Sequence, residues 1–182
     1  MSTYLNSYQK RNKLNRCFFY KNVHQTSFTI DKLSLFYTQK KDVSLKPLVK
    51  VAALLELITR QRAFFIRSRK SSVFRKIRKG APSGVKVTLR KNVLACFLIK
   101  LIWEIFPVVR NFRLRTKFNK LKQEQLNSLI YLIPDPLVFH EIKNFYFLFK
   151  ACVNLRVSIS FSKNLLKKEF FFNVRFLQLP VA

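Results

Sequence analysis

Residues 76–90 read Lys-Ile-Arg-Lys-Gly-Ala-Pro-Ser-Gly-Val-Lys-Val-Thr-Leu-Arg. Both glycines of the chain, Gly80 and Gly84, lie in this stretch, and glycine adopts turn conformations that other residues avoid. After Gly84 the apolar and polar residues alternate, which indicates a strand with one buried face. We therefore predict a turn followed by a strand. Its core side would carry Val85, Val87 and Leu89, and its opposite side Lys86, Thr88 and Arg90.

The residues before this strand predict its partner. Ala63–Arg67 is a short apolar segment, and the polar, basic segment Ser71–Ser83 separates it from the strand at 85–90. The sequence thus predicts two strands joined by a long basic loop. Thr29–Thr38, rich in β-branched and aromatic residues, predicts a further strand. Alanines and leucines after Pro47 predict a helix that ends near Thr59.

Asn92–Val109 is the most apolar stretch of the chain and has two interpretations. Lys100 and Glu104 lie on one helix face, and Pro107 ends the helix before it reaches the roughly 18 clean apolar residues of a membrane span. A core helix is favoured over a membrane span. An amphipathic helix is predicted at residues 4–20, which mix aromatic and basic residues.

The second half of the chain predicts fewer regular elements. Arg110–Gln125 is polar and basic and is interpreted as a loop or RNA contact, and Ser128–Val138 as an edge strand or irregular hairpin. Asn154–Ser162 alternates clearly and predicts a half-buried strand. Ser162 would then cap a last helix that runs to about Gln178. Together the elements predict one α+β domain over residues 1–182, with a mainly antiparallel sheet of about four strands packed with helices.

Composition restricts the partners of this domain. Lys and Arg number 36 against 8 Asp and Glu, which gives a formal net charge of +28 and points to nucleic acid or anionic lipid. The chain is nevertheless 49% hydrophobic with 20 Phe, so a folded core is expected rather than a disordered basic tail. Two Gly among abundant Phe, Lys, Asn and Ile fit an A+T-rich organelle gene.

No pattern in the sequence indicates an enzyme. The eight acids are dispersed, His24 and His140 have no neighbouring metal or catalytic partner, and the three cysteines are far apart. We therefore predict no catalytic residue, no metal site and no cofactor. By contrast, no acid interrupts the twelve cations between Arg60 and Lys91, whereas a merely solvated face normally mixes both signs. This stretch predicts an RNA-binding surface.

The chain resembles the universal large-subunit ribosomal protein five family. The similarity rests on Leu57–Gln61, Arg69–Ser71 and Lys76–Arg90, followed by Pro107-Val108-Val109-Arg110-Asn111-Phe112-Arg113, so that residues 46–113 match best. Weaker similarities are Ile30–Thr38, Phe139–Ile142, Leu155–Lys163 and Leu177–Pro180. The sequence departs from the family at Phe36, where an RNA-contacting Asn is usual, at Arg60, where Gly is usual, and over Leu121–Leu132.

The resemblance implies a non-enzymatic protein of the central protuberance that binds 5S rRNA and contacts the P-site tRNA. It implies polar RNA contacts at Gln61 and Thr88, and phosphate contacts at Arg69, Lys70, Lys86 and Arg90. The charge run adds Arg62 and Arg67. The tRNA-facing loop would use Arg75, Lys76, Arg78 and Lys79.

The expected location is the large subunit of a mitochondrial ribosome, in preference to a plastid one. Expected partners are rRNA, whether 5S or its substitute, P-site tRNA and neighbouring ribosomal proteins, including small-subunit proteins, with no membrane. The basic residues before Asp31 resemble a transit peptide, but family-like helix sequence from about Tyr4 favours an organelle-encoded chain without a cleaved leader. The alternative is a basic organellar protein associated with a membrane.

Overall fold

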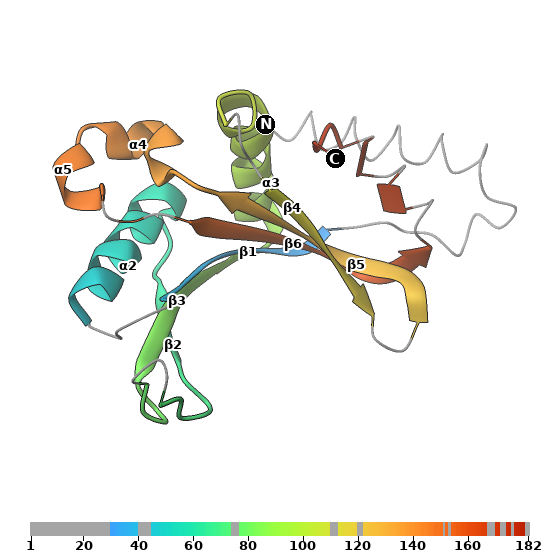
Figure 1. Cartoon of the computed structure of the whole chain (residues 1–182). Coiled ribbons are helices and arrows are strands. Elements are labelled where there is room, and N and C mark those ends of the chain that lie inside the picture. The colour runs from blue at the N-terminus through green and yellow to red at the C-terminus, as the bar shows by residue number, and fades with distance from the viewer. Residues whose placement is uncertain are drawn as a thin grey trace, which may run out of the picture.

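In the part of the chain that the structure describes, six antiparallel strands form one sheet in the order β2-β3-β1-β6-β5-β4 (Figure 1). The computed structural model describes residues 30–39, 45–73, 77–109, 113–119, 122–150, 152, 154–166, 170–171, 174–175 and 177–180. The helix predicted at 4–20 lies outside these residues. The strands are β1 (Ile30–Thr38), β2 (Phe64–Arg67), β3 (Pro82–Leu89), β4 (Arg113–Asn119), β5 (Lys122–Ile133) and β6 (Leu155–Leu166).

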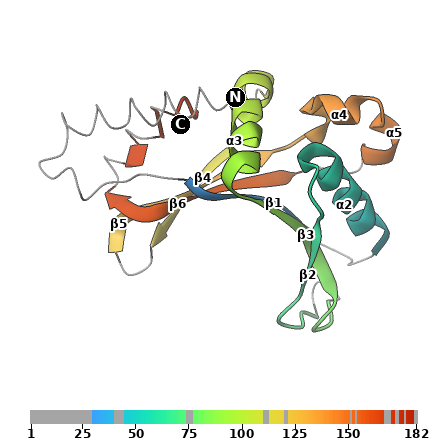
Figure 2. The ribbon, with the colours of Figure 1, turned by 180° about the vertical axis from the view of Figure 1, so that it is seen from behind.

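The helices α2, α3, α4 and α5 lie on one side of the sheet (Figures 1 and 2). Within the described part of the chain, no helix lies on the other side, which we call the open face. In chain order the helical segments are α2 (Leu45–Thr59), α3 (Lys91–Lys100), the π-helical turn η1 (Leu101–Ile105), the 3-10 turn η2 (Pro136–Val138), α4 (His140–Lys143) and α5 (Tyr146–Phe149). The predicted α+β class with an antiparallel sheet is confirmed.

The core lies between the sheet and these helices. Strand alternation turns Leu33 and Leu35 of β1, and Val157 and Ile159 of β6, into the core, where all four are fully buried. Aromatic rings fill the space beneath the helices. Tyr131 contacts Phe106 with ring centroids 4.9 Å apart, Phe97 stacks on Phe139 at 6.3 Å, and Phe161 meets Phe170 edge to face at 5.1 Å. The expected folded core is confirmed, and among the described residues it contains six phenylalanines, although leucine is its most frequent residue.

Three predictions about the second half of the chain were wrong. Residues 113–119, expected to be a loop or an RNA contact, form β4, and 122–125 begin β5, so the described part of the sheet has six strands rather than about four. Residues 128–133, expected to belong to an edge strand or an irregular hairpin, form the second half of β5, which lies between β6 and β4. Residues 163–166 continue β6 instead of beginning a helix capped by Ser162. Farther along, the described residues 170–171 and 174–175 are helical.

The apolar stretch 92–109 forms α3 and then a π-helical turn that ends before Pro107. Leu94, Phe97, Leu98, Leu101 and Ile105 are buried, as expected for a core helix. Across the described residues, no helix is long and apolar enough to span a bilayer.

An ion pair fixes the end of α3 to α4. The Lys100 ammonium donates to Glu141 Oε1 and lies over the Phe139 ring, 5.6 Å from its centroid. Partial burial by itself would raise the pKa of Glu141. The hydrogen bond from Lys100, a backbone hydrogen bond and the charges of Lys100 and His140 together lower the pKa below its usual range. The contacts place Lys100 in an interhelix junction, at the end of a helix whose residues 93–99 are apolar.

Candidate nucleic-acid interface

Strand β3 has the two faces predicted from its alternation. Val85, Val87 and Leu89 are fully buried, whereas Lys86 and Thr88 are partly exposed. β3 pairs with β1, which places Thr88 beside Ser34 and Lys86 beside Phe36 on the open face. On its other side Lys86 pairs with the exposed Phe64 of β2. Two predicted RNA-binding residues are therefore brought together on the open face.

The turn between α2 and β2 holds two more predicted residues, Gln61 and Arg62, and both are exposed. Thr59 Oγ1 donates to the Leu55 carbonyl at 2.7 Å and accepts from the Gln61 backbone N–H at 3.3 Å. The Glu56 carboxylate accepts the Ala63 N–H at 2.8 Å. These side-chain bonds replace the helical bonds that α2 no longer supplies at its end, and they fix the turn.

The connection between β2 and β3 is partly ordered by its own hydrogen bonds. Ser68 N–H donates to the Ala81 carbonyl at 2.8 Å, and Gly80 N–H donates to the Ser68 carbonyl at 2.9 Å. Ser72 and Ile77 form a bridge, and the Ile77 side chain is only 8% exposed. The loop therefore has a buried apolar residue, which sequence reasoning did not weigh.

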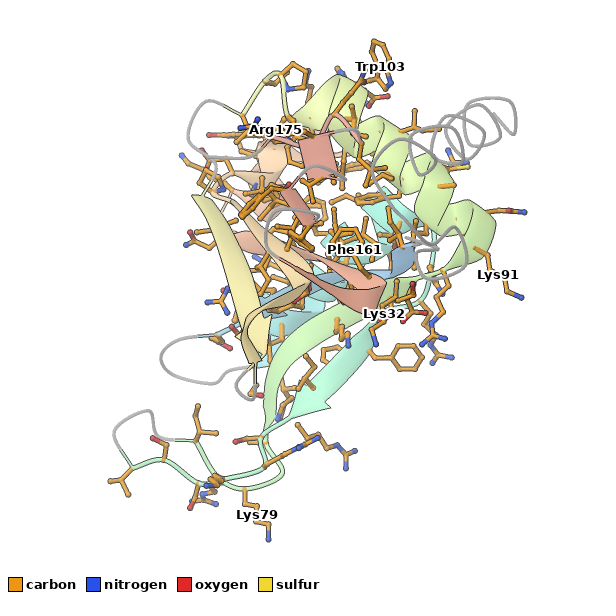
Figure 3. The ribbon with its side chains drawn as sticks, turned by 90° about the vertical axis from the view of Figure 1, so that its right-hand side faces the viewer. Lys32, Lys79, Lys91, Trp103, Phe161 and Arg175 are labelled. Carbon is orange, nitrogen blue, oxygen red and sulfur yellow. The ribbon has the colours of Figure 1, made fainter. Side chains whose placement is uncertain are left out.

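The predicted cations of this connection are exposed where the structure describes them: Arg67, Arg69, Lys70, Arg78 and Lys79. Arg75 and Lys76 lie outside the described residues. Figure 3 shows Lys79 at the far end of the hairpin, well away from Trp103 at the opposite end of the molecule. Arg90, in extended conformation between β3 and α3, is also exposed. The predicted residues thus form two groups, one on or next to the sheet and one at the hairpin tip.

Known proteins similar to this chain decide its family. Large ribosomal subunit protein uL5m of Reclinomonas americana is 39% identical over 132 residues, which cover 72% of this chain and 70% of that protein. Large ribosomal subunit protein uL5c of Cyanidium caldarium is 36% identical over 75% of this chain and 76% of that protein. The chain belongs to the uL5 family.

A bacterial member, large ribosomal subunit protein uL5 of Thermosipho melanesiensis, is 38% identical over 57% of each chain. No family model matches the chain. As a uL5 protein the chain is a component of the large ribosomal subunit and not an enzyme, and rRNA and other ribosomal proteins are its partners. The predicted family is confirmed.

One departure from the uL5 pattern has a visible backbone consequence. Arg60, which stands where the family usually has Gly, follows α2 with a φ of 53°. This is the left-handed conformation in which helices commonly end and which glycine adopts without strain. A non-glycine residue is disfavoured there by roughly 1–2 kcal/mol. The turn that carries Gln61 and Arg62 therefore keeps the expected backbone shape while gaining a cation.

Sequence reasoning missed Arg156, which lies on the same face as Lys86 and Thr88. Arg156 of β6 pairs with Phe36 of β1, and its guanidinium carbon lies 5.8 Å from the Phe36 ring centroid. The alternation of residues 154–162 does place Arg156 on the polar side of its strand. What the sequence could not give was the pairing of β6 with β1, which brings that polar side next to β3.

Proposed function

We propose that this uL5 protein is a structural constituent of the mitochondrial large ribosomal subunit, in the mitochondrial matrix. In this proposal the whole chain, 1–182, is one domain. It binds 5S rRNA, or the RNA that replaces it, in the central protuberance. It also contacts P-site tRNA and neighbouring ribosomal proteins, including small-subunit proteins across the subunit interface. The similarity to a mitochondrial uL5m supports the organelle, although a plastid uL5c is similar over a comparable share of the chain.

The proposed RNA binding is supported mainly by the exposed cations from the α2–β2 turn to the hairpin tip, a series that no acidic residue interrupts. Two ion pairs join side chains of the described residues, Lys32 with Asp31 and Lys100 with Glu141. Neither involves a cation predicted to bind RNA. With a net charge of +28, phosphate groups are the natural counter-charges for these side chains. Guanidinium groups can hold phosphate oxygens with two parallel hydrogen bonds.

The first prediction concerns salt. Affinity of the purified chain for large-subunit rRNA is expected to fall by about 0.7–0.9 log unit per contacted phosphate for each tenfold rise in salt, because bound counterions are released. Filter binding across a salt series measures this slope. In organelle extracts the chain should follow large subunits through detergent and leave them at high salt. Affinity independent of salt, or loss of the chain in detergent, would contradict the proposal.

The second prediction separates the two groups of cations. Neutralising Arg75, Lys76, Arg78 and Lys79 to Gln should weaken retention of P-site tRNA while incorporation into large subunits stays nearly unchanged. Lys86→Gln with Arg90→Gln should impair incorporation first, because Lys86 projects from a strand whose alternate side chains are buried in the core. Gradient sedimentation of labelled variants and tRNA binding to the isolated subunits test this. The reverse pattern would refute the division.

A further inference from the structure

A row of side-chain positions crosses the open face of the sheet from β2 to β5, over five neighbouring strands. Cross-strand pairing joins Phe64 to Lys86, Lys86 to Phe36, Phe36 to Arg156, and Arg156 to Leu132. Directly paired residues of antiparallel strands project from the same face, so these four pairings define one line. Along the line, apolar and cationic side chains alternate from β2 to β5.

The centre of this row is Phe36, with a cation on each side. Arg156 lies over its ring at 5.8 Å, and Lys86 is its partner on β3. The ring is partly exposed and does not belong to the core, which Leu35 and Tyr37 of the same strand face from the other side. A large apolar ring on a sheet face without a described helix requires an explanation other than core packing.

The next row along the strands consists of small hydroxyl residues. Thr88, Ser34 and Ser158 pair across β3, β1 and β6, directly beside Lys86, Phe36 and Arg156. These short side chains leave the ring and the guanidinium as the tall groups at the centre of the face. A flat ligand that approaches the face meets the ring and the guanidinium before it meets the backbone.

We propose that an unpaired nucleotide of the rRNA stacks its base on the surface formed by Phe36 and Arg156, with Lys86 at a neighbouring phosphate. Aromatic rings and guanidinium planes both stack on unpaired bases, whatever the base, because every base has a π face. A duplex cannot use this surface in the same way, since its bases are already stacked within the helix. This inference rests on rRNA binding and adds to it a stacking site for single-stranded RNA.

The test compares the binding of fluorescein-labelled oligoadenylate, as a short single strand and as a duplex with oligouridylate, by the full-length chain. The single strand is expected to bind more tightly. Phe36→Leu should weaken single-strand binding by about 5- to 150-fold, the range expected for one lost base stack. The salt dependence of Phe36→Leu should equal that of the parent chain, since no charge is lost. Phe36→Trp keeps an aromatic ring, so its affinity for the single strand should be close to that of the parent chain. Lys86→Gln should instead reduce the salt slope by about 0.7.

Two further variants keep the test decisive. Phe147→Leu is the matched control: it makes the same change at a ring that is 92% exposed on α5, and it should bind RNA like the parent chain. Arg156→Lys keeps the charge but removes the stacking plane, so it should weaken binding without changing the salt slope. It answers the question even if Phe36→Leu proves unstable in a thermal melt.

The outcomes separate this inference from the proposed function. If Phe36→Leu and Arg156→Lys bind the single strand like the parent chain, stacking is wrong while rRNA binding stands. If Phe36→Leu binds the single strand like the parent chain but is no longer incorporated into the large subunit, the ring contacts a protein and the inference fails. If the parent chain does not bind large-subunit rRNA at all, the proposed function itself fails.

Discussion

Replacing Phe139 with alanine is expected to lower the free energy of unfolding by about 3–5 kcal/mol, the range for deleting a buried Phe side chain. The ring is fully buried between the end of α3 and the start of α4. It stacks on Phe97 at 6.3 Å and carries the Lys100 ammonium above it. Alanine would remove the stacked partner and the surface beneath the Lys100–Glu141 ion pair. Denaturant unfolding of the purified chain measures the loss.

Phe147→Ala provides the control in the same segment. The chemical change is identical, but the Phe147 ring is 92% exposed. Its removal should change the free energy of unfolding by no more than about 0.5 kcal/mol. Similar losses in both variants would show that burial does not distinguish the two rings and that the α3–α4 junction is not part of the cooperative core.

Gly84→Ala is expected to have the second large effect, a loss of about 3 kcal/mol, at the upper end of the usual range for overpacking. A Cβ at Gly84 would lie 2.4 Å from the Tyr37 carbonyl oxygen, which is a backbone atom of the neighbouring strand β1. The two strands would have to separate where the hairpin begins. The thermal midpoint should fall, and amide exchange should increase in β1 and β3.

Gly80→Ala is the matched comparison, because it adds the same methyl group to the other glycine. No atom lies within 4 Å of a Cβ there, but the φ of 85° is left-handed. The expected cost is only the conformational one, about 1–2 kcal/mol. If the close approach of β1 to Gly84 is the cause, Gly84→Ala should lower the free energy of unfolding by more than Gly80→Ala does. The opposite order would refute this explanation.

These two glycines show what the sequence could and could not predict. Their neighbourhood predicted a turn, and Gly80 provides it with its positive φ. Gly84 instead lies inside β3, where it is needed because β1 passes close by. That second requirement depends on which strand is the neighbour, and local sequence carries no such information. The alternation of 85–90 and 154–162 was sufficient to predict β3 and most of β6.

The missed strand β4 has a physical explanation. Its sequence, Arg-Leu-Arg-Thr-Lys-Phe-Asn, alternates, but with only two apolar residues. A strand at the edge of a sheet with one open face can form with few apolar side chains, so low hydrophobicity did not exclude it. The candidate site shows the same limit. Lys86 and Thr88 followed from one strand's pattern, whereas Arg156 and Phe36 joined them only through pairing between distant segments.

The strand order has a further consequence for how the chain is made. β2, β3 and β1 come from residues 30–89, β6, β5 and β4 from residues 113–166, and the two halves meet at the pairing of β1 with β6. During translation, the edge of β1 that pairs with β6 stays unpaired until β6, the last strand among the described residues, has been synthesised. Such long-range closure is slow, and an exposed strand edge is prone to aggregate in the meantime. A chain that stops before Leu155 would retain the basic hairpin but leave this edge of β1 unpaired. Premature termination would therefore produce an aggregation-prone fragment and not a shorter functional protein.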